Sequence, residues 1–414
     1  MTGPGLPRLL AGVRAGRPVG LAEHRSHHGT PEEAVARGDE LVDAVAAAGL
    51  RGRGGAGFPT AVKLRAVADA RGRKALVVNG TEGEPMSAKD RVLLSLAPHL
   101  VLDGVRLAAD AVGARQIVIA VTTAAAPQRA ALQHALQARP DLREARVVAV
   151  PDGYLSGEES ALLRSLNGGP AKPTTVPPRP YQRGLRRRPT LVSNAETLAQ
   201  LALIARHGPD WFRALGPPEH PGSALVTLGG AAPRPGVVEL ELGTPAEELV
   251  GAPRALLVGG YHGTWLSGEN AAVMTLDDAS LATAGASLGA GVLFALPDRA
   301  CPVGEVARVM RWLERQGAGQ CGPCIHGLDA IATTVEALAD GVASAGDLDD
   351  LRRWCGELPG RGACHHPDGA VRFLRSALDV FADEWDDHRR RGPCDACDLP
   401  TLLAVPRTQT RLVA

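Results

Sequence analysis

One short apolar run in the chain ends in a turn dipeptide, and it reads Lys74-Ala-Leu-Val-Val-Asn-Gly80. Consecutive apolar residues over this length are typical of a strand that is buried on both faces of a parallel sheet. Two further runs, Gln116–Val121 and Arg146–Val150, predict strands of the same kind, with helical patterns between them. Strands and helices that alternate at this spacing predict an α/β fold with helices on the faces of a parallel sheet.

The pattern changes near residue 220. Short strands are expected at Ala224–Leu228, Val237–Leu242 and Ala255–Val258, with one brief helix near residues 245–250, which predicts a small α+β unit. From Val303 onward the apolar spacing is helical and predicts a bundle. The expected division is a leader with a glycine-rich loop (1–60), the sheet domain (61–221), the α+β domain (222–300), the helical bundle with a metal-binding region (301–392) and a tail (393–414).

Composition excludes several classes of protein. The 414 residues carry 45 basic and 45 acidic side chains, so a generally basic nucleic-acid-binding protein is not expected. No apolar stretch approaches the length that spans a bilayer, and the first residues lack the apolar centre of a secretory signal. We therefore expect a cytoplasmic protein without direct membrane insertion, or one at the periphery of a membrane complex. Six of the seven cysteines follow residue 320, which indicates a metal or redox centre near the C-terminus.

A glycine-rich loop precedes the first strand, with the sequence Gly49-Leu-Arg-Gly-Arg-Gly-Gly-Ala-Gly-Phe-Pro-Thr60. Such a loop at the start of a helix presents backbone N–H groups and the positive helix end to an anion. Lys63, one turn into that helix, can meet a phosphate as a point charge. The loop matches neither the Gly-x-Gly-x-x-Gly nor the Walker pattern, and a flexible linker is the alternative interpretation.

Polar motifs come directly after the expected strands. Ligands of open α/β sheets bind at the carboxyl ends of the strands, so these motifs are candidate binding residues. The first is Asn79-Gly-Thr-Glu-Gly-Glu-Pro85 followed by Lys89-Asp-Arg91. Its carboxylates Glu82 and Glu84 would repel a phosphate, so they suit hydroxyls, ring N–H groups or a cationic ring. A solvated acidic turn is the alternative interpretation.

Two more motifs have equally plain structural explanations. In Asp152-Gly-Tyr-Leu-Ser-Gly-Glu-Glu159, Tyr154 offers a stacking face, while Glu158 and Glu159 also suit the start of a helix. In Pro189-Thr-Leu-Val-Ser-Asn-Ala-Glu-Thr-Leu198, Asn194 is a candidate helix N-cap and Thr197 lies one turn in.

The cysteine motif is Gly319-Gln-Cys-Gly-Pro-Cys324, with Cys364 forty residues later. Two thiolates at this spacing together with a third indicate a metal site. Buried cysteines with a purely structural role are the alternative interpretation.

The order of these motifs resembles that of the NADH-binding 51-kDa flavoproteins of respiratory complex I, a family with relatives in NAD-linked hydrogenases and formate dehydrogenases. The resemblance runs from about Gly49 to about Leu378. It rests on the glycine loop, on Asn-x-x-Glu-x-Glu-Pro with Lys-Asp-Arg, on Ser-Gly-Glu-Glu-Ser-Ala-Leu, and on Pro-Thr-x-Val-x-Asn-x-Glu-Thr-Leu. Pro235-Gly-Val, Gly243-Thr-Pro and Ser280–Gly289 are similar to the family's small module and to the stretch before its bundle. The implied fold is a Rossmann-like FMN/NADH domain, a ubiquitin-like domain and a helical bundle.

The resemblance implies FMN, NAD(H) and an iron–sulfur cluster of the [4Fe-4S] type as cofactors. FMN is expected at Gly54, Gly55, Lys63, Asn79, Gly157, Asn194 and Thr197. NADH is expected at Phe58 beside the adenine, and at Glu82, Glu84, Tyr154 and Glu159 around the ribose and nicotinamide. Ala56, Thr81 and Glu158 complete the expected cofactor-binding residues, and Cys321, Cys324 and Cys364 are the expected metal ligands. No catalytic acid or base is expected, because the cofactor carries the chemistry.

Three positions depart from the family pattern. Ala318 stands where the first thiolate of the cluster motif belongs, Thr81 replaces an Asp, and Ala66 replaces an aromatic near the adenine. The fourth cluster ligand could come from several residues or from solvent; these residues are Cys355, His326, His365, and the tail pair Cys394 and Cys397. A three-iron cluster, a lost cluster, or zinc on the two Cys-x-x-Cys pairs are the other possibilities. The missing aromatic predicts a weaker affinity for NADH.

The predicted function is NADH oxidation by an FMN enzyme that passes single electrons through an iron–sulfur cluster to a partner. The expected partner is a ferredoxin-like or thioredoxin-fold subunit in a hetero-oligomer. The alternative is a non-catalytic flavin-binding or assembly subunit, which the substitutions at Thr81, Ala66 and Ala318 favour. A sugar- or cobalamin-binding role for the α+β unit has little support.

Overall fold

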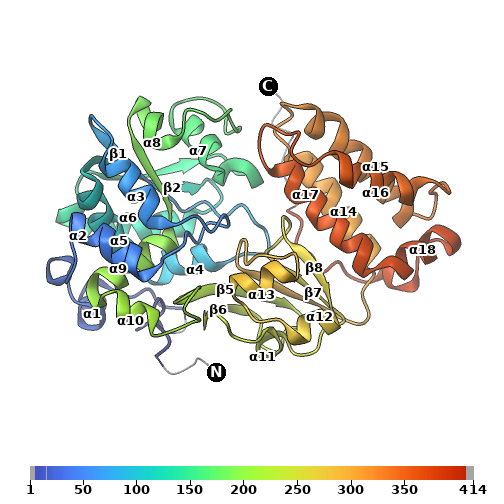
Figure 1. Cartoon of the computed structure of the whole chain (residues 1–414), viewed down its shortest axis with the longest axis horizontal. Helices are drawn as coiled ribbons and strands as arrows, with labels where there is room; N and C mark the ends of the chain where they lie inside the picture. The colour runs from blue at the N-terminus through green and yellow to red at the C-terminus, as the bar shows by residue number, and fades with distance from the viewer. Residues whose placement is uncertain (1–4, 15, 407–414) are drawn as a thin grey trace.

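The computed structural model describes residues 5–14 and 16–406, which form two β-sheets and a helical bundle (Figure 1). The parallel sheet and its helices, blue to green in Figure 1, lie at one side of the molecule. The second sheet, in yellow, lies between them and the orange and red helices of the bundle.

The parallel sheet is built from β1 (Lys74–Asn79), β2 (Ala114–Thr122), β3 (Ala145–Val150) and β4 (Thr190–Asn194) in the order β3-β2-β1-β4. The chain moves outward from β1 through β2 to β3, and β4 then pairs with the other side of β1. Asn79, the last residue of β1, is in register with Asn194, the last residue of β4. Such a reversal of strand order opens a crevice outside the carboxyl ends of the two strands.

Both faces of β1 are buried, as the apolar run predicts. Leu76 and Val78 point into the larger core, whereas Ala75 and Val77 point into a smaller one that also contains Leu162. Successive side chains alternate between the faces of a strand. Strand β1 therefore lies between two apolar layers, and it pairs with β2 on one side and with β4 on the other.

Within the described residues, ten α-helices accompany this sheet. They are α1 (Leu21–His28), α2 (Asp39–Ala48), α3 (Thr60–Ala68), α4 (Lys89–Leu96), α5 (Pro98–Val112), α6 (Ala126–Gln137), α7 (Glu159–Leu166), α8 (Pro180–Arg183), α9 (Ala195–His207) and α10 (Pro209–Arg213). Helices α5 and α9 pack closely because Gly104 has no side chain: a Cβ at that position would lie 1.9 Å from the carbonyl oxygen of Leu198. Short 3₁₀ turns lie at Pro31–Glu33, Pro140–Leu142, Tyr154–Gly157, Leu185–Arg187 and Asp395–Asp398.

The second sheet is mixed. Its strands are β5 (Ser223–Gly230), β6 (Gly236–Glu241), β7 (Ala255–Val258), β8 (Thr264–Ser267) and β9 (Val292–Leu296), in the order β6-β5-β9-β7-β8. Only the pair of β5 with β9 is parallel. Helices α11 (Ala246–Val250), α12 (Gly268–Val273) and α13 (Asp278–Thr283) accompany it.

The bundle contains α14 (Pro302–Gln316), α15 (Leu328–Ala339), α16 (Asp347–Glu357), α17 (His366–Val380) and α18 (Ala382–Arg391). A single π turn, Pro323–Gly327, leads into α15. Trp265 and Phe294 of the second sheet share one apolar core with Met310 and Phe373 of the bundle. The bundle and the second sheet are therefore held together by a common core.

The structure differs from the sequence-based expectation in two places. Residues 1–60 were expected to form a leader and loop, but they contain α1 and α2. Leu41, Val42 and Val45 of α2 are buried at helical spacing, and they pack into the core beside the parallel sheet. Strands β4, β8 and β9 were not predicted, because each is short and β4 runs directly into α9.

No single helix in the described part of the chain is long and apolar enough to cross a membrane. Helices α4 and α5 together are long and apolar enough to span a membrane, but the chain bends by 93° between them.

Candidate functional site

The glycine-rich loop packs on the first turn of α9. The backbone N–H of Arg53 donates to Thr197 Oγ1 at 2.8 Å, and a Cβ on Gly54 would lie 3.3 Å from the Cβ of Asn194. Gly55 has a φ of 104°, a conformation that favours glycine. Gly54, Gly55 and Ala56 are exposed. The backbone of the loop is thus accessible to a ligand, and its contacts with α9 hold it at the carboxyl ends of β1 and β4, where the strand order reverses.

Asn79 and Asn194 mark the carboxyl ends of the adjacent strands β1 and β4. Asn79 Nδ2 donates to the carbonyl of Gly157 at 2.8 Å, and its Oδ1 accepts from Thr81 Oγ1 at 2.6 Å. Asn194 caps α9 by accepting from the N–H groups of its first turn, and its Nδ2 donates to Asp90 Oδ2 at 2.7 Å. The sequence motifs that contain these residues therefore meet at one edge of the sheet.

A buried ion network lies beneath this edge. Lys89 Nζ is 3.0 Å from Asp90 Oδ1 and 3.0 Å from Glu196 Oε2. Burial lowers the pKa of Lys89, but the carboxylates of Asp90 and Glu196 outweigh it and hold that pKa above its ordinary value. Glu196 also accepts from the backbone N–H of Leu225 in β5 at 2.9 Å, so the network joins the two sheets.

A cavity of about 310 Å³ lies between the glycine loop and the second sheet's unit. Its lining includes residues 51–53 and 55–57, Lys89, Glu196, His220, Asp278, residues 286–289 and Gly291. Arg53 is buried there, and burial lowers its pKa. Its Nη2 donates to the carbonyl of Ser223 at 3.1 Å, whereas its buried Nε has no hydrogen-bond partner among residues 5–14 and 16–406. A buried donor without a partner beside an open glycine loop fits an anionic ligand such as the phosphate of FMN.

The two predicted carboxylates Glu82 and Glu84 both have partners within the protein. Glu82 accepts from Ser87 Oγ at 2.7 Å and from the N–H of Asp90 at 3.0 Å, at the start of α4. Burial and the neighbouring Asp90 raise its pKa. Glu84 accepts from the backbone N–H of Tyr261 at 2.8 Å, and burial raises its pKa to about 7. Both side chains thus brace the loop after β1.

Tyr154 also lies at an internal junction. Its hydroxyl donates to Glu84 Oε2 at 3.1 Å, and its ring packs edge-on against His262 and Trp312, with centroids 4.6 and 5.2 Å away. Its N–H donates to Gln316 Oε1 at 3.0 Å, at the end of α14. Tyr154 therefore connects the parallel sheet to the bundle.

Phe58, Lys63 and Glu159 lie nearer the surface. Phe58 is 46% exposed, as an aromatic ring that binds a base would be. Lys63 Nζ pairs with Glu159 Oε1 at 2.9 Å, and both side chains are partly exposed. Exposed ion pairs contribute at most about 1 kcal/mol, so the pair can reopen for a ligand. Glu158 is held instead as the cap of α7, where it accepts from the N–H of Ser160 at 3.0 Å.

Cys321, Cys324 and Cys364 are neighbours at the C-terminal end of α14. Burial, with the nearby Cys321 and Cys364, raises the pKa of the Cys324 thiol to about 11, while backbone N–H groups of Gly319 and Ala318 act in the opposite direction. Ala318 is itself buried. Three thiols in one neighbourhood are ligands of the type that an iron–sulfur cluster takes.

The other candidates for a fourth ligand have different surroundings. Cys355 is buried, and the charged groups that act on it belong to Arg375 and Asp379. His326 is exposed, and His365 is fully exposed and pairs with Asp368. Cys397 lies 3.4 Å from Cys301, in the loop before the 15-residue helix α14.

A helix of that length rises about 22 Å. The tail pair Cys394 and Cys397 therefore lies far from Cys321 and Cys324, and zinc bound by the two Cys-x-x-Cys pairs is excluded.

Comparison with known proteins places this geometry in a family. Residues 45–203 match the Nuo51 FMN-binding domain, and residues 305–388 match the NADH-ubiquinone oxidoreductase-F iron-sulfur binding region. The F 2 subunit of NADH-quinone oxidoreductase of Rhizobium meliloti (strain 1021) is 33% identical over 383 residues, which cover 86% of this chain and 90% of that protein. The chain belongs to the family of NADH-quinone oxidoreductase F subunits.

Further relatives agree. The F subunit of the Escherichia coli (strain K12) NADH-quinone oxidoreductase is 32% identical over 399 residues, 89% of this chain and 90% of that protein. The NAD⁺-reducing [NiFe]-hydrogenase has been solved in the H₂-reduced state and in the air-oxidized state. The matched chains are 32% and 31% identical with TM-scores of 0.78 and 0.79, and they cover 85% and 91% of this chain. The chain spans 63% and 66% of those solved chains.

These matches confirm the predicted family, the α/β flavoprotein fold, and FMN and an iron–sulfur cluster as cofactors. Sequence reasoning quoted Arg53, Lys89 and Glu196 within its motifs but did not assign them to the site. Arg53 is part of the glycine-rich loop, and a basic residue among these glycines could have indicated a contact with an anion. Glu196 stood inside the motif after Asn194, but its contact with Leu225 of the second sheet has no local signature.

Proposed function

We propose that this chain takes hydride from NADH onto FMN and passes single electrons through an iron–sulfur cluster to a partner protein. The observation that carries the proposal is the exposed glycine loop at the carboxyl ends of β1 and β4, beside a buried Arg53 whose Nε has no partner in the described part of the chain. An anion-binding backbone at this position of a parallel sheet suits a flavin phosphate. Bound FMN supplies the exchange between hydride and single electrons, so no catalytic side-chain acid or base is needed.

The flavin-binding residues act by position and charge. We assign Gly54, Gly55, Ala56, Lys63, Asn79, Gly157, Asn194 and Thr197 to FMN. The loop amides and Arg53 provide donors that folding has already oriented, so binding the anion needs little reorganisation. The Lys89 network fixes the start of α9 under the site. Asn79 holds Gly157 against β1, which shapes the crevice where the flavin would lie.

The nucleotide-binding residues divide into two groups. We assign direct contacts with NADH to Phe58 and Glu159, which are accessible. Glu82, Glu84, Tyr154, Thr81 and Glu158 shape the surrounding loops, since each already bonds within the protein. Cys321, Cys324 and Cys364 hold the cluster.

The relatives are subunits by name, so this chain is part of a hetero-oligomer. We further propose that the partner is a ferredoxin-like or thioredoxin-fold subunit, and that the complex faces the cytoplasm.

Anaerobic titration tests the proposed reaction. The full chain is loaded with FMN, and NADH or NADPH is added while the visible flavin absorbance is followed. We expect NADH to bleach the flavin. A chain that takes up no FMN would refute the flavin site, and a bound flavin that neither nucleotide reduces would instead support the non-catalytic alternative.

Two glycine variants make the test specific to the loop. In Gly54→Val the new side chain would meet Asn194, so FMN binding should fall at least tenfold, about 1.4 kcal/mol. Gly346→Val is the matched control, because a Cβ there meets no atom within 4 Å and φ is −89°. Equal FMN affinity in the two variants would count against the loop.

A further inference from the structure

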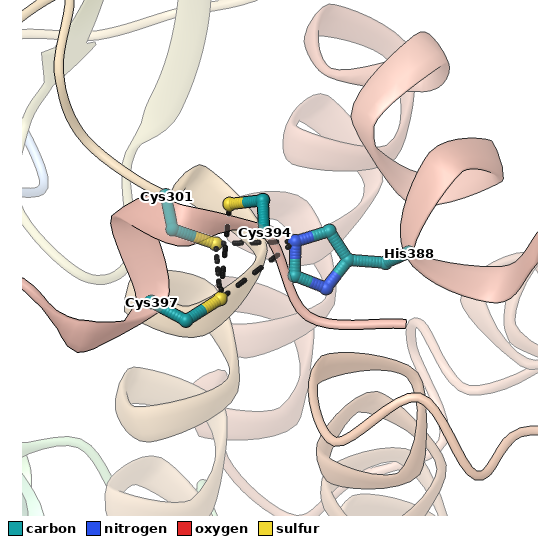
Figure 2. Close-up of side chains that lie close together, drawn as sticks. All are labelled: Cys301, His388, Cys394 and Cys397. Atoms are coloured by element: carbon teal, nitrogen blue, oxygen red, sulfur yellow. Dashed lines mark hydrogen bonds between the residues drawn. The ribbon is translucent and has the colours of Figure 1, made fainter. Parts of the chain in front are cut away.

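A second group of metal-binding side chains lies at the N-terminal end of α14 (Figure 2). We call it the tail site, and its members are Cys301, His388, Cys394 and Cys397. Figure 2 shows the three sulfur atoms and one ring nitrogen turned toward one another, and these atoms all lie within 4.8 Å of one another. They come from the loop before α14, from α18 and from the turn after α18, so three separate parts of the chain meet here.

The spacing of the ligand atoms matches one tetrahedral ion. Two sulfur pairs, Cys301 with Cys397 and Cys394 with Cys397, are 3.4 and 3.8 Å apart. His388 Nε2 is 3.3 Å from the Cys301 sulfur and 3.9 Å from the Cys397 sulfur. Zinc bonds of about 2.3 Å to sulfur and about 2.0 Å to nitrogen in a tetrahedron require separations of about 3.8 Å between sulfurs and about 3.5 Å between sulfur and nitrogen.

We propose that the tail site binds one Zn²⁺ through three cysteine thiolates and one histidine. Three thiolates and an imidazole form a closed ligand set, which leaves no position for substrate and is typical of a structural ion. A [4Fe-4S] cluster binds each ligand on a separate iron, and a [2Fe-2S] cluster binds two ligands on each of two irons. In either case the four ligand atoms would spread farther apart than the 4.8 Å within which they lie here. The site is also separated by the length of α14 from the thiols assigned to the cluster.

The surroundings of the tail site suit a bound cation with thiolate ligands. Cys301 is the N-cap of α14, and its sulfur accepts from the backbone N–H of Gly304 at 3.2 Å. A helix N-terminus and a backbone donor both stabilise a thiolate. The carbonyls of Leu338 and Ala339 lie near the His388 ring, although its buried Nδ1 makes no hydrogen bond to the described residues. Cys394 is exposed, which gives the ion a route of entry.

The proposed ion would fix the tail against the rest of the molecule. Beyond Cys397 the N–H groups of Leu402 and Leu403 donate to Glu305 at 2.8 and 2.9 Å. The backbone carbonyl of Ala404 then accepts from the Tyr261 hydroxyl at 2.7 Å. The backbone N–H of Ala404 lies 3.3 Å from the Met86 sulfur. Met86 follows Glu84 in the loop after β1. Zinc at the tail site would thus hold residues 399–405 on the loop that borders the proposed nucleotide site.

Metal analysis of the full chain tests the proposal independently of any reaction with NADH. The chain and its variants are purified anaerobically from zinc-supplemented cultures, and zinc, iron and sulfide are measured. We expect about one zinc per chain. Cys397→Ser should lose at least about nine tenths of that zinc. Cys355→Ser is the matched control, because Cys355 is a buried cysteine outside the tail site, and it should keep its zinc.

A measurement on the unaltered chain covers the case in which a variant fails to fold. Removing zinc with a chelator should make the tail after Arg391 sensitive to limited proteolysis, and refilling with Co²⁺ should give visible bands of a tetrahedral thiolate complex. Three outcomes would overturn the proposal: a chain without zinc that takes up no Co²⁺, a Cys301–Cys397 disulfide in its place, or zinc content that Cys397→Ser does not change. Iron and sulfide lost together in Cys397→Ser would also overturn it.

Discussion

The two ends of α14 arrange sulfur ligands differently. At the C-terminal end Cys321, Cys324 and Cys364 are neighbours, and the buried Ala318 stands where a fourth thiolate would be expected. At the N-terminal end the four members of the tail site lie within 4.8 Å of one another. Both ends contain a Cys-x-x-Cys pair, so this spacing does not decide which metal is bound. The kind of metal at each end depends on how many further ligands join the Cys-x-x-Cys pair and on how those ligands are oriented.

The two ends also connect to different parts of the molecule. Gln316, at the C-terminal end, accepts from the N–H of Tyr154 after β3. Glu305, near the N-terminal end, holds the tail through Leu402 and Leu403. One end of the helix therefore faces the flavin-binding sheet, and the other end organises the last residues of the chain.

Loss of a cluster thiolate should have the largest effect. Cys324→Ser removes a buried ligand of the three-thiolate set, so we expect nearly complete loss of iron and sulfide. Zinc at the tail site should remain, because that site shares no ligand with the cluster. Metal analysis of the anaerobically purified variant beside Cys355→Ser checks both statements. Simultaneous loss of iron and zinc would show that the two ends are not independent.

Protonation of Glu84 should give the next largest effect, since Glu84 bonds Tyr154 on the flavin side and Tyr261 on the tail side. Burial raises its pKa from 4.5 to about 7, so the folded chain keeps a proton that the unfolded chain has already lost. Stability should therefore fall as pH rises from about 4.5 to about 7, by up to about 3 kcal/mol, and change little above that range.

Glu84→Gln tests this dependence. The amide cannot ionise and can still accept from the N–H of Tyr261. Denaturant unfolding at pH 5 and pH 8, without nucleotide, should therefore show a smaller loss of stability in the variant than in the unaltered chain. An identical pH dependence in both would exclude Glu84 as its source.

Restoring an aromatic near the proposed adenine position should have a smaller effect. Ala66 is partly exposed on α3, close in sequence to the exposed Phe58. A stacked base contributes about 1–3 kcal/mol, so Ala66→Phe should tighten NADH binding by about tenfold. Titration of NADH into the FMN-loaded protein measures this change, and the metal content of both ends of α14 should not change. Unchanged affinity would mean that Ala66 does not border the nucleotide.

The fold was predictable where each element carries its own pattern. The apolar run of β1 and the helical spacing of α14 predicted buried elements, and the comparisons confirm the fold class. Helix α2 was hidden by glycines and prolines around it, although Leu41, Val42 and Val45 have helical spacing. Strand β4 ends at Asn194, where the helix cap was the stronger signal.

The sequence predicted which motifs form the site better than it predicted the hydrogen-bond partners of their residues. Motif order was enough to identify the glycine loop and the family. The internal partners of Glu84 were not predictable, because Tyr261 is 177 residues away in the chain. Of the tail site, Cys394 and Cys397 were named as candidate metal ligands, but Cys301 and His388 were missed, since Cys301 carries no motif and meets Cys397 across 96 residues. Contacts of this kind depend on how whole units pack.

Adding the missing thiolate should give the smallest change and the most direct comparison of the two ends. Ala318 is buried, and its backbone N–H acts on the Cys324 thiol, so a side chain there begins beside the cluster cysteines. An iron without a protein thiolate is the one most easily lost to oxidation. Ala318→Cys should therefore retain about one more iron per chain after a fixed exposure to air. Ala318→Ser is the control, because its hydroxyl has nearly the same size but is a poor iron ligand. Equal iron loss in both variants would mean that the fourth iron already has a ligand from elsewhere. A gain only in Ala318→Cys would show that the cluster end lacks a single protein ligand, whereas the tail site has all four of its own.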